Sequence, residues 1–180
     1  LFRSGDNPYF NEAVNDRLRL WQFLEDEVKY TAYGTGTFTQ TGGLNTIAEG
    51  TIGSLNFGAL STGNGTYNLS GTGQLVSGKS IYVGDAGVGS FVQTGGTVNI
   101  NSTTDARNDL YLGNASTATG TYTISGGTLN VADEVTVGVN GAGTFNIQPG
   151  ANVFVGDRIN IGAGDTVNMS GGTLRLLGVE

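Results

Sequence analysis

The stretch 120-GTYTISGGTLNVADEVTVG-138 decides the fold. Apolar and polar residues alternate along it in three short runs, and this period of two is typical of half-buried β-strands. Glycines follow the first and the third run, where the chain needs a tight corner. Strands this short bury little surface alone, so they must pack against neighbours. The predicted inward residues are Tyr122, Ile124, Leu129, Val131, Val135 and Val137.

Variants of this stretch recur along the chain from residue 34 onward. They begin with GTFTQTGG (36), GTYNLSGT (65), GSFVQTGG (89), GTYTISGG (120), GTFNIQPG (143) and DTVNMSGG (165). Their aligned positions are Phe38, Tyr67, Phe91, Tyr122, Phe145 and Val167, separated by 29, 24, 31, 23 and 22 residues. The shortest intervals approximate one unit, and the longer ones contain insertions.

Each unit has three strands, and like residues recur at like positions. Two places after the aromatic position, the first strand has a second inward residue: Gln40, Leu69, Gln93, Ile124, Ile147 and Met169. The second strand offers Val98/Ile100, Leu129/Val131, Val153/Val155 and Leu174/Leu176, with Leu44/Ile47 and Leu75 as less regular members. The third offers Leu55/Phe57, Ile81/Val83, Leu110/Leu112, Val135/Val137 and Ile159/Ile161.

This repeat predicts an all-β fold, a parallel β-helix (β-solenoid) of about five or six three-stranded rungs over residues 34–180. Each unit would form one rung and stack on the next, so that hydrogen bonds run between rungs. A β-sandwich would show hairpin turns without a fixed unit, and the blades of a propeller need about 40 residues.

Residues 1–33 differ in composition from the rest of the chain. Gly5 is the only glycine before Tyr33, although the whole chain has 32. Apolar residues spaced by three or four positions, from Phe10 to Val28, predict an amphipathic α-helix from about Pro8 to Tyr30. We expect this segment to cap the first rung or to dock on another subunit.

The repeats GTYTISGGTLNVADEVTVG and GSFVQTGGTVNI resemble the glycine-rich β-strand repeats of autotransporter passenger domains and of PEP-CTERM-type exported bacterial surface proteins. The resemblance covers residues 34–177. It implies an extracellular or cell-surface location and a structural or adhesive role without catalysis.

Composition excludes several functions. The chain has no Cys and no His, which excludes disulfides, Cys nucleophiles, Ser-His-Asp catalysis and His-ligated zinc. The net charge of −7 argues against a nucleic-acid partner, and no apolar run is long enough for membrane insertion.

The ends of the predicted solenoid are candidate interfaces. The last unit has two predicted strands and no third, so we expect its lower face to be covered either by further sequence or by another copy. Stacking of copies head to tail would give a homo-oligomer or a polymer. The candidate interface residues are Phe10, Val14, Leu18 and Trp21 at one end and Leu174, Leu176 and Leu177 at the other.

One solenoid face offers a different kind of binding surface. Tyr82 and Tyr111 are predicted to lie on adjacent rungs as an outward aromatic pair, which could bind a glycan or a surface protein or could simply stabilise the sheet. Outward threonines such as Thr123 suggest an ice-binding array, but their column reads Thr39, Asn68, Val92, Thr123, Asn146 and Asn168, which is too mixed.

Acidic residues gather before the third strands. Asp109, Asp133, Glu134 and Asp157 are the candidate calcium ligands, and no other cofactor is predicted. Glu134 could equally pair with Arg158. The leading interpretation is a non-enzymatic extracellular fibre, filament or matrix subunit; a cell-surface adhesin is second, and a carbohydrate-active enzyme that uses the stacked acids is third.

Overall fold

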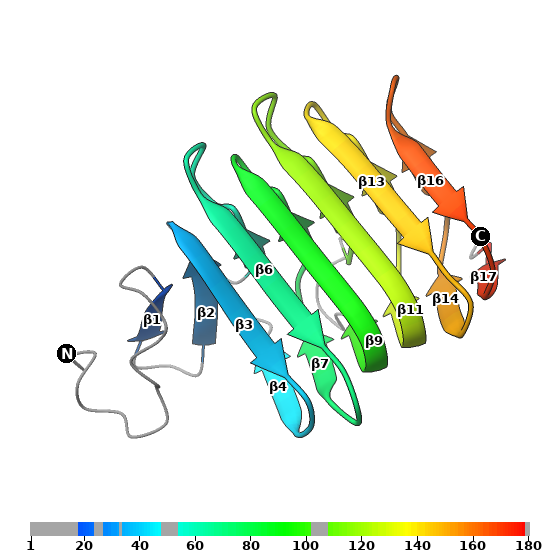
Figure 1. Cartoon of the computed structure of the whole chain (residues 1–180), viewed down its shortest axis with the longest axis horizontal. Helices are drawn as coiled ribbons and strands as arrows, with labels where there is room; N and C mark the ends of the chain where they lie inside the picture. Colours follow the sequence, from blue (N-terminus) through cyan, green and yellow to red (C-terminus); the bar gives the residue numbers. More distant parts are fainter. Residues whose placement is uncertain (1–17, 24–26, 33, 48–53, 102–107, 179–180) are drawn as a thin grey trace.

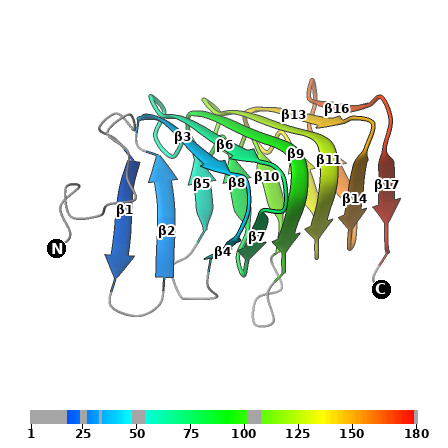
Figure 2. The ribbon, with the colours of Figure 1, turned by 60° about the horizontal axis from the view of Figure 1, so that its bottom comes forward.

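The computed structural model describes residues 18–23, 27–32, 34–47, 54–101 and 108–178. All regular secondary structure in these ranges is β-strand, and they contain no helix. Apart from one antiparallel pair, the strands are parallel and lie in three columns (Figures 1 and 2). No helix in the described ranges is long and apolar enough to cross a membrane.

The first column lies in front in Figure 1 and consists of the strands that begin each repeat. Its aromatic positions stand opposite one another in register, from Phe38 through Tyr67, Phe91, Tyr122 and Phe145 to Val167. The strands are β3 (Thr35–Gln40), β6 (Asn64–Leu69), the first parts of β9 (Val88–Ile100) and β11 (Thr119–Val131), β13 (Ala142–Ile147) and β16 (Thr166–Met169).

The second column continues from the first after each glycine corner. β9 and β11 run through the corner without interruption, and Leu129 of β11 stands between Val98 and Val153 of its neighbours. The column consists of β4 (Leu44–Ile47), β7 (Gln74–Ser77), the second parts of β9 and β11, β14 (Ala151–Val155) and β17 (Thr173–Leu176).

The third column forms a separate sheet of short strands. It runs from β5 (Leu55–Phe57) through β8 (Ile81–Val83), β10 (Leu110–Leu112) and β12 (Val135–Val137) to β15 (Ile159–Ile161). From β3 onward the chain passes through the first, second and third columns in turn and then returns to the first. This arrangement of parallel strands is consistent with the predicted β-solenoid.

The side chains between the columns form one apolar core. Most of the predicted inward residues are buried in it, including Tyr122, Ile124, Leu129, Val135 and Val137 at 0 % exposure. Aromatic rings stack along the first column: the centroids of Phe91 and Tyr122 are 4.5 Å apart and those of Tyr67 and Phe91 are 4.8 Å apart. The alternation of polar and apolar residues therefore predicted the core through most of the repeat.

The predicted inward orientation of Leu44 is wrong. Leu44 is 65 % exposed, whereas Ile47 is buried, because residues three apart in a strand point to opposite faces. Asn45 turns inward instead, and its side-chain amide donates a 3.1 Å hydrogen bond to the hydroxyl of Tyr67. The sequence reasoning also missed the buried Ser77, which stands opposite Ile47.

The predicted helix from Pro8 to Tyr30 is also wrong where the structure describes it. β1 (Leu18–Phe23) and β2 (Glu27–Ala32) form an antiparallel pair, and β2 adds to the third column where Thr31 stands opposite Asn56. This segment is rich in aromatic and β-branched residues, which favour strands, and the edge of β5 offers backbone hydrogen bonds that a helix cannot use. Residues 8–17 lie outside the described ranges.

Candidate functional site

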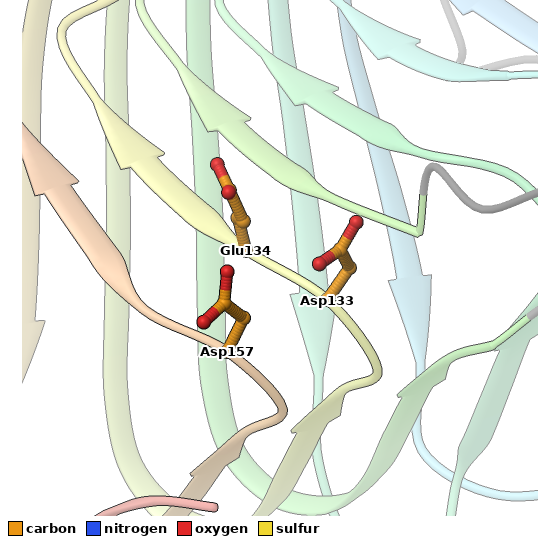
Figure 3. Close-up of side chains that lie close together, drawn as sticks. All are labelled: Asp133, Glu134 and Asp157. Atoms are coloured by element: carbon orange, nitrogen blue, oxygen red, sulfur yellow. The ribbon is translucent and has the colours of Figure 1, made fainter. Parts of the chain in front are cut away.

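Three carboxylates gather at the corner that leads into the third column. Asp133 and Glu134 directly precede β12, and Asp157 occupies the corresponding corner before β15. One oxygen from each of them lies within 4.8 Å of the others, and Figure 3 shows the three side chains grouped together. We call these residues the acidic corner. The parallel register of the columns explains why residues 24 positions apart meet here.

Arg158 compensates part of the charge of the acidic corner. Its Nη2 lies 2.6 Å from Oε1 of Glu134 and 3.1 Å from Oδ2 of Asp157, and its Nε also donates to Glu134. The other oxygen of Glu134, Oε2, accepts a 2.7 Å hydrogen bond from the side chain of Asn160. Since the Arg158 side chain is 61 % exposed, solvent screens these ion pairs and they contribute little to stability.

Among the described residues, Asp133 makes no ion pair, in contrast to Glu134 and Asp157. Partial burial raises its pKa, and the negative charges of Asp109, Glu134 and Asp157 raise it further. Arg158 lowers the pKa of Asp133, but this is the smallest of the effects. Accumulated negative charge is what a divalent cation could neutralise, so calcium binding by Asp133, Glu134 and Asp157 stays a prediction.

Asp109, the fourth predicted ligand, has a different role. It is only 5 % exposed, and its Oδ2 accepts a 2.6 Å hydrogen bond from the hydroxyl of Tyr111. Its Oδ1 accepts a 3.1 Å hydrogen bond from the backbone N–H of Glu134, and its own N–H donates to Ser80 Oγ. These bonds connect three successive passes of the chain, so Asp109 has a structural role at this corner.

The predicted tyrosine pair is present. Tyr82 of β8 stands opposite Tyr111 of β10, and their rings stack with centroids 4.9 Å apart and an angle of 20° between the planes. Both residues are half-buried. Each ring therefore covers one face of the other, which leaves less aromatic surface for a ligand than two separate rings would offer.

Among the residues whose burial is described, four of the eight exposed large apolar side chains lie at the C-terminal edge, which β15, β16 and β17 form. Within the described ranges each of these strands pairs on one side only, with β12, β13 and β14 respectively. Ile161 and Met169 were predicted to be inward core residues, but they lie exposed on this edge. The exposed apolar residues are Ile161 (54 %), Met169 (51 %), Leu176 (51 %) and Leu177 (53 %).

The predicted interface residues divide between the two ends. Leu176 and Leu177 are on the C-terminal edge, and Leu174 beside them is partly buried against the core. Leu18 and Trp21 belong to β1 at the opposite end of the third column, whereas Phe10 and Val14 lie outside the described ranges. Ile161 and Met169 are the last predicted members of their columns. This position could have placed them with Leu176 and Leu177 at the edge.

A shallow hollow lies at the other end of the first two columns. It has a volume of about 490 Å³, is lined by residues 38–45 of β3, β4 and their corner, and contains none of the predicted carboxylate ligands. Comparisons of the chain with models of protein families, with curated proteins and with solved structures found no match.

Proposed function

We propose that this chain is a non-enzymatic structural protein that assembles end to end into a fibre, filament or matrix. In this proposal the parallel columns form a β-solenoid with five complete rungs, from β3 to β15, and a sixth that β16 and β17 begin. The observation that supports it most directly is the C-terminal edge, where Ile161, Met169, Leu176 and Leu177 expose apolar surface beside strands paired on one side.

Open strand edges favour such assembly. An unpaired edge presents a row of N–H and C=O groups that can bond to another strand, and exposed apolar side chains along it add burial of about 25 cal/mol per Å². A second copy that supplies strands in the same direction would continue the columns. Such a contact joins different surfaces of the two copies, so it can repeat without closing. The extracellular location implied by the resemblance belongs to this proposal.

The experiment places one negative charge on the edge. Leu176→Asp should abolish assembly, seen as loss of large species in sedimentation velocity and of filaments in negative-stain electron microscopy. Thr173→Asp is the matched control, because Thr173 is an exposed position of the same strand that adds no apolar surface. A wild-type protein that is monomeric at every concentration, or a Leu176→Asp variant that assembles normally, would overturn the proposal.

Adhesion to a glycan or protein surface through the third column is the second candidate, and the part of the Tyr82 and Tyr111 pair that stays exposed would be its contact surface. Replacing both tyrosines with Ser should abolish adhesion to cells or glycan arrays and leave assembly unchanged. Catalysis by the acidic corner is the third candidate; the ion pairs that Glu134 and Asp157 make with Arg158 favour a structural role instead.

A further inference from the structure

The outward face of the first column contains an unbroken row of hydroxyl groups. Thr37, Thr66, Ser90, Thr121, Thr144 and Thr166 stand opposite one another in six neighbouring strands. At about 4.8 Å between strands, the row extends over roughly 24 Å. The strands that form it lie side by side across the front of the molecule in Figure 1. We call this row the hydroxyl ladder.

A second row of neutral side chains runs parallel to the hydroxyl ladder, two residues further along each strand. It consists of Thr39, Asn68, Val92, Thr123, Asn146 and Asn168. The twelve positions of the two rows contain no charged and no aromatic side chain. This face therefore carries no formal charge, whereas the acidic corner has three carboxylates.

Part of this second row is already fixed by hydrogen bonds between strands. The side-chain amide of Asn146 donates to the hydroxyl of Thr123 at 3.2 Å, and the amide of Asn168 donates to Oδ1 of Asn146 at 2.9 Å. These bonds hold the polar groups in line along the column. The side chains of Thr123, Asn146 and Asn168 are therefore ordered before a ligand arrives and have little side-chain entropy left to lose.

We propose that this face binds an extended, uncharged polysaccharide that lies along the hydroxyl ladder. Each strand offers one hydroxyl, and a β-linked pyranose chain advances by about the spacing between strands with each sugar, so successive sugars can meet successive hydroxyls. Each neutral hydrogen bond is weak after exchange with water. Binding therefore depends on many contacts along an ordered polymer, and not on a single sugar.

The chemistry of the face favours this partner over the others. It has no Lys or Arg that could pair with an anionic polymer, and it has no apolar patch that would hold a second copy of the chain in water. The face also differs from the C-terminal edge and from the tyrosine pair, so this proposal does not depend on the proposed function.

The test is co-sedimentation of the purified chain with insoluble cellulose and chitin, with the anionic polymer alginate as a comparison. A quadruple variant removes hydroxyls and keeps residues that suit strands. It carries Thr66→Val, Ser90→Ala, Thr121→Val and Thr144→Val. Two further variants form a matched pair: Thr121→Arg obstructs the ladder, and Thr136→Arg adds the same side chain at an outward position of the third column. Circular dichroism and thermal unfolding establish that all four proteins are folded.

The wild type and Thr136→Arg should be retained by cellulose or chitin even at high salt, because the contacts are uncharged. The quadruple variant and Thr121→Arg should be retained at least roughly tenfold less. The proposal is overturned if neither polymer retains the wild type, if alginate retains it better, or if the folded variants bind equally. The proposal is also overturned if the quadruple variant and Thr121→Arg lose self-association or adsorption to ice but still bind polysaccharide as the wild type does.

Discussion

Tyr122 donates a 2.7 Å hydrogen bond from its hydroxyl to Oε1 of Gln93 in the neighbouring strand of the first column. Both side chains are completely buried. The amide of Gln93 in turn donates to the carbonyls of Thr128 at 3.0 Å and Gly96 at 3.3 Å. Burial raises the pKa of Tyr122 well above its usual range, so its hydroxyl remains a donor. The two residues form a satisfied polar unit inside an apolar core.

This relationship follows a rule along the first column. A tyrosine follows a strand whose second inward residue is glutamine, and a phenylalanine follows one whose second inward residue is aliphatic, where each strand is compared with the preceding strand of the column. The pairs are Tyr67 with Gln40 (2.5 Å between hydroxyl and Oε1), Phe91 with Leu69, Tyr122 with Gln93 and Phe145 with Ile124. In the first column, each buried glutamine is thus paired with a tyrosine hydroxyl.

A double-mutant cycle on Tyr122 and Gln93 tests this coupling. Tyr122→Phe leaves the Gln93 oxygen without its donor and should cost about 1–2 kcal/mol in unfolding free energy. Gln93→Leu removes the acceptor of the tyrosine hydroxyl and the amide that donates to two backbone carbonyls, and it should cost more, about 2–4 kcal/mol. The double variant reproduces the Phe-next-to-aliphatic combination and should cost less than the sum of the two. Denaturant titration measures all three; additive costs would show that the pair is not coupled.

The sequence was sufficient to predict the columns because their physical signal repeats. Each strand shows a period of two, and each repeat places its aromatic residue at the same offset from a glycine corner. Hence Tyr122, Val137 and Leu129 could be assigned to the core before any contact was known, and the register of Tyr82 with Tyr111 followed from counting residues.

The sequence was not sufficient where the repeat weakens. Residues 18–32 show apolar spacing compatible with a helix, and only the neighbouring edge of β5 decides in favour of strands. Leu44 and Ile47 looked like one inward pair although their odd spacing forbids it. The acidic corner could be located by alignment, but the bonds that occupy Asp109 involve Tyr111 and a backbone N–H, which no alignment of repeats predicts.

Two glycines in similar conformations should respond differently to substitution. Gly84 (φ +74°) and Gly43 (φ +70°) both have positive φ, so alanine costs about 1–2 kcal/mol at either position. A Cβ at Gly84 would also lie 2.4 Å from the carbonyl oxygen of Thr119, whereas a Cβ at Gly43 would have no heavy atom within 4 Å. Gly84→Ala should therefore lower the melting temperature clearly more than Gly43→Ala. Equal losses would contradict the close backbone approach at Gly84.

The raised pKa of Asp133 predicts a pH dependence of stability. Because the folded state holds this proton more tightly than the unfolded chain, stability falls as pH rises from the usual Asp pKa of 3.8 through the raised value. Asp133→Asn removes this penalty and should raise the melting temperature at pH 7 slightly, because solvent screens the charges around this side chain. The gain should vanish below about pH 3.8, where Asp133 is protonated in both states. A gain that is independent of pH would indicate a cause other than charge.

Calcium and Arg158 should compete for the acidic corner. The guanidinium of Arg158 occupies Oε1 of Glu134 and Oδ2 of Asp157, which are two of the oxygens that a cation would need. Calcium should therefore raise the melting temperature of the wild type only slightly, at concentrations of the order of a millimolar. Arg158→Gln removes the competing charge and should strengthen the effect of calcium.

The control for this prediction is the double variant Arg158→Gln/Asp133→Asn, which removes one carboxylate from the opened corner. Calcium should raise its melting temperature less than that of Arg158→Gln alone, because the affinity for a hard cation increases with the number of charged oxygens around it. Magnesium should be the weaker ion throughout, since it gives up its water reluctantly. If calcium stabilises all the variants equally, the ion binds elsewhere. The carboxylates of Asp133, Glu134 and Asp157 then have only a structural role at this corner, where Glu134 and Asp157 form ion pairs with Arg158.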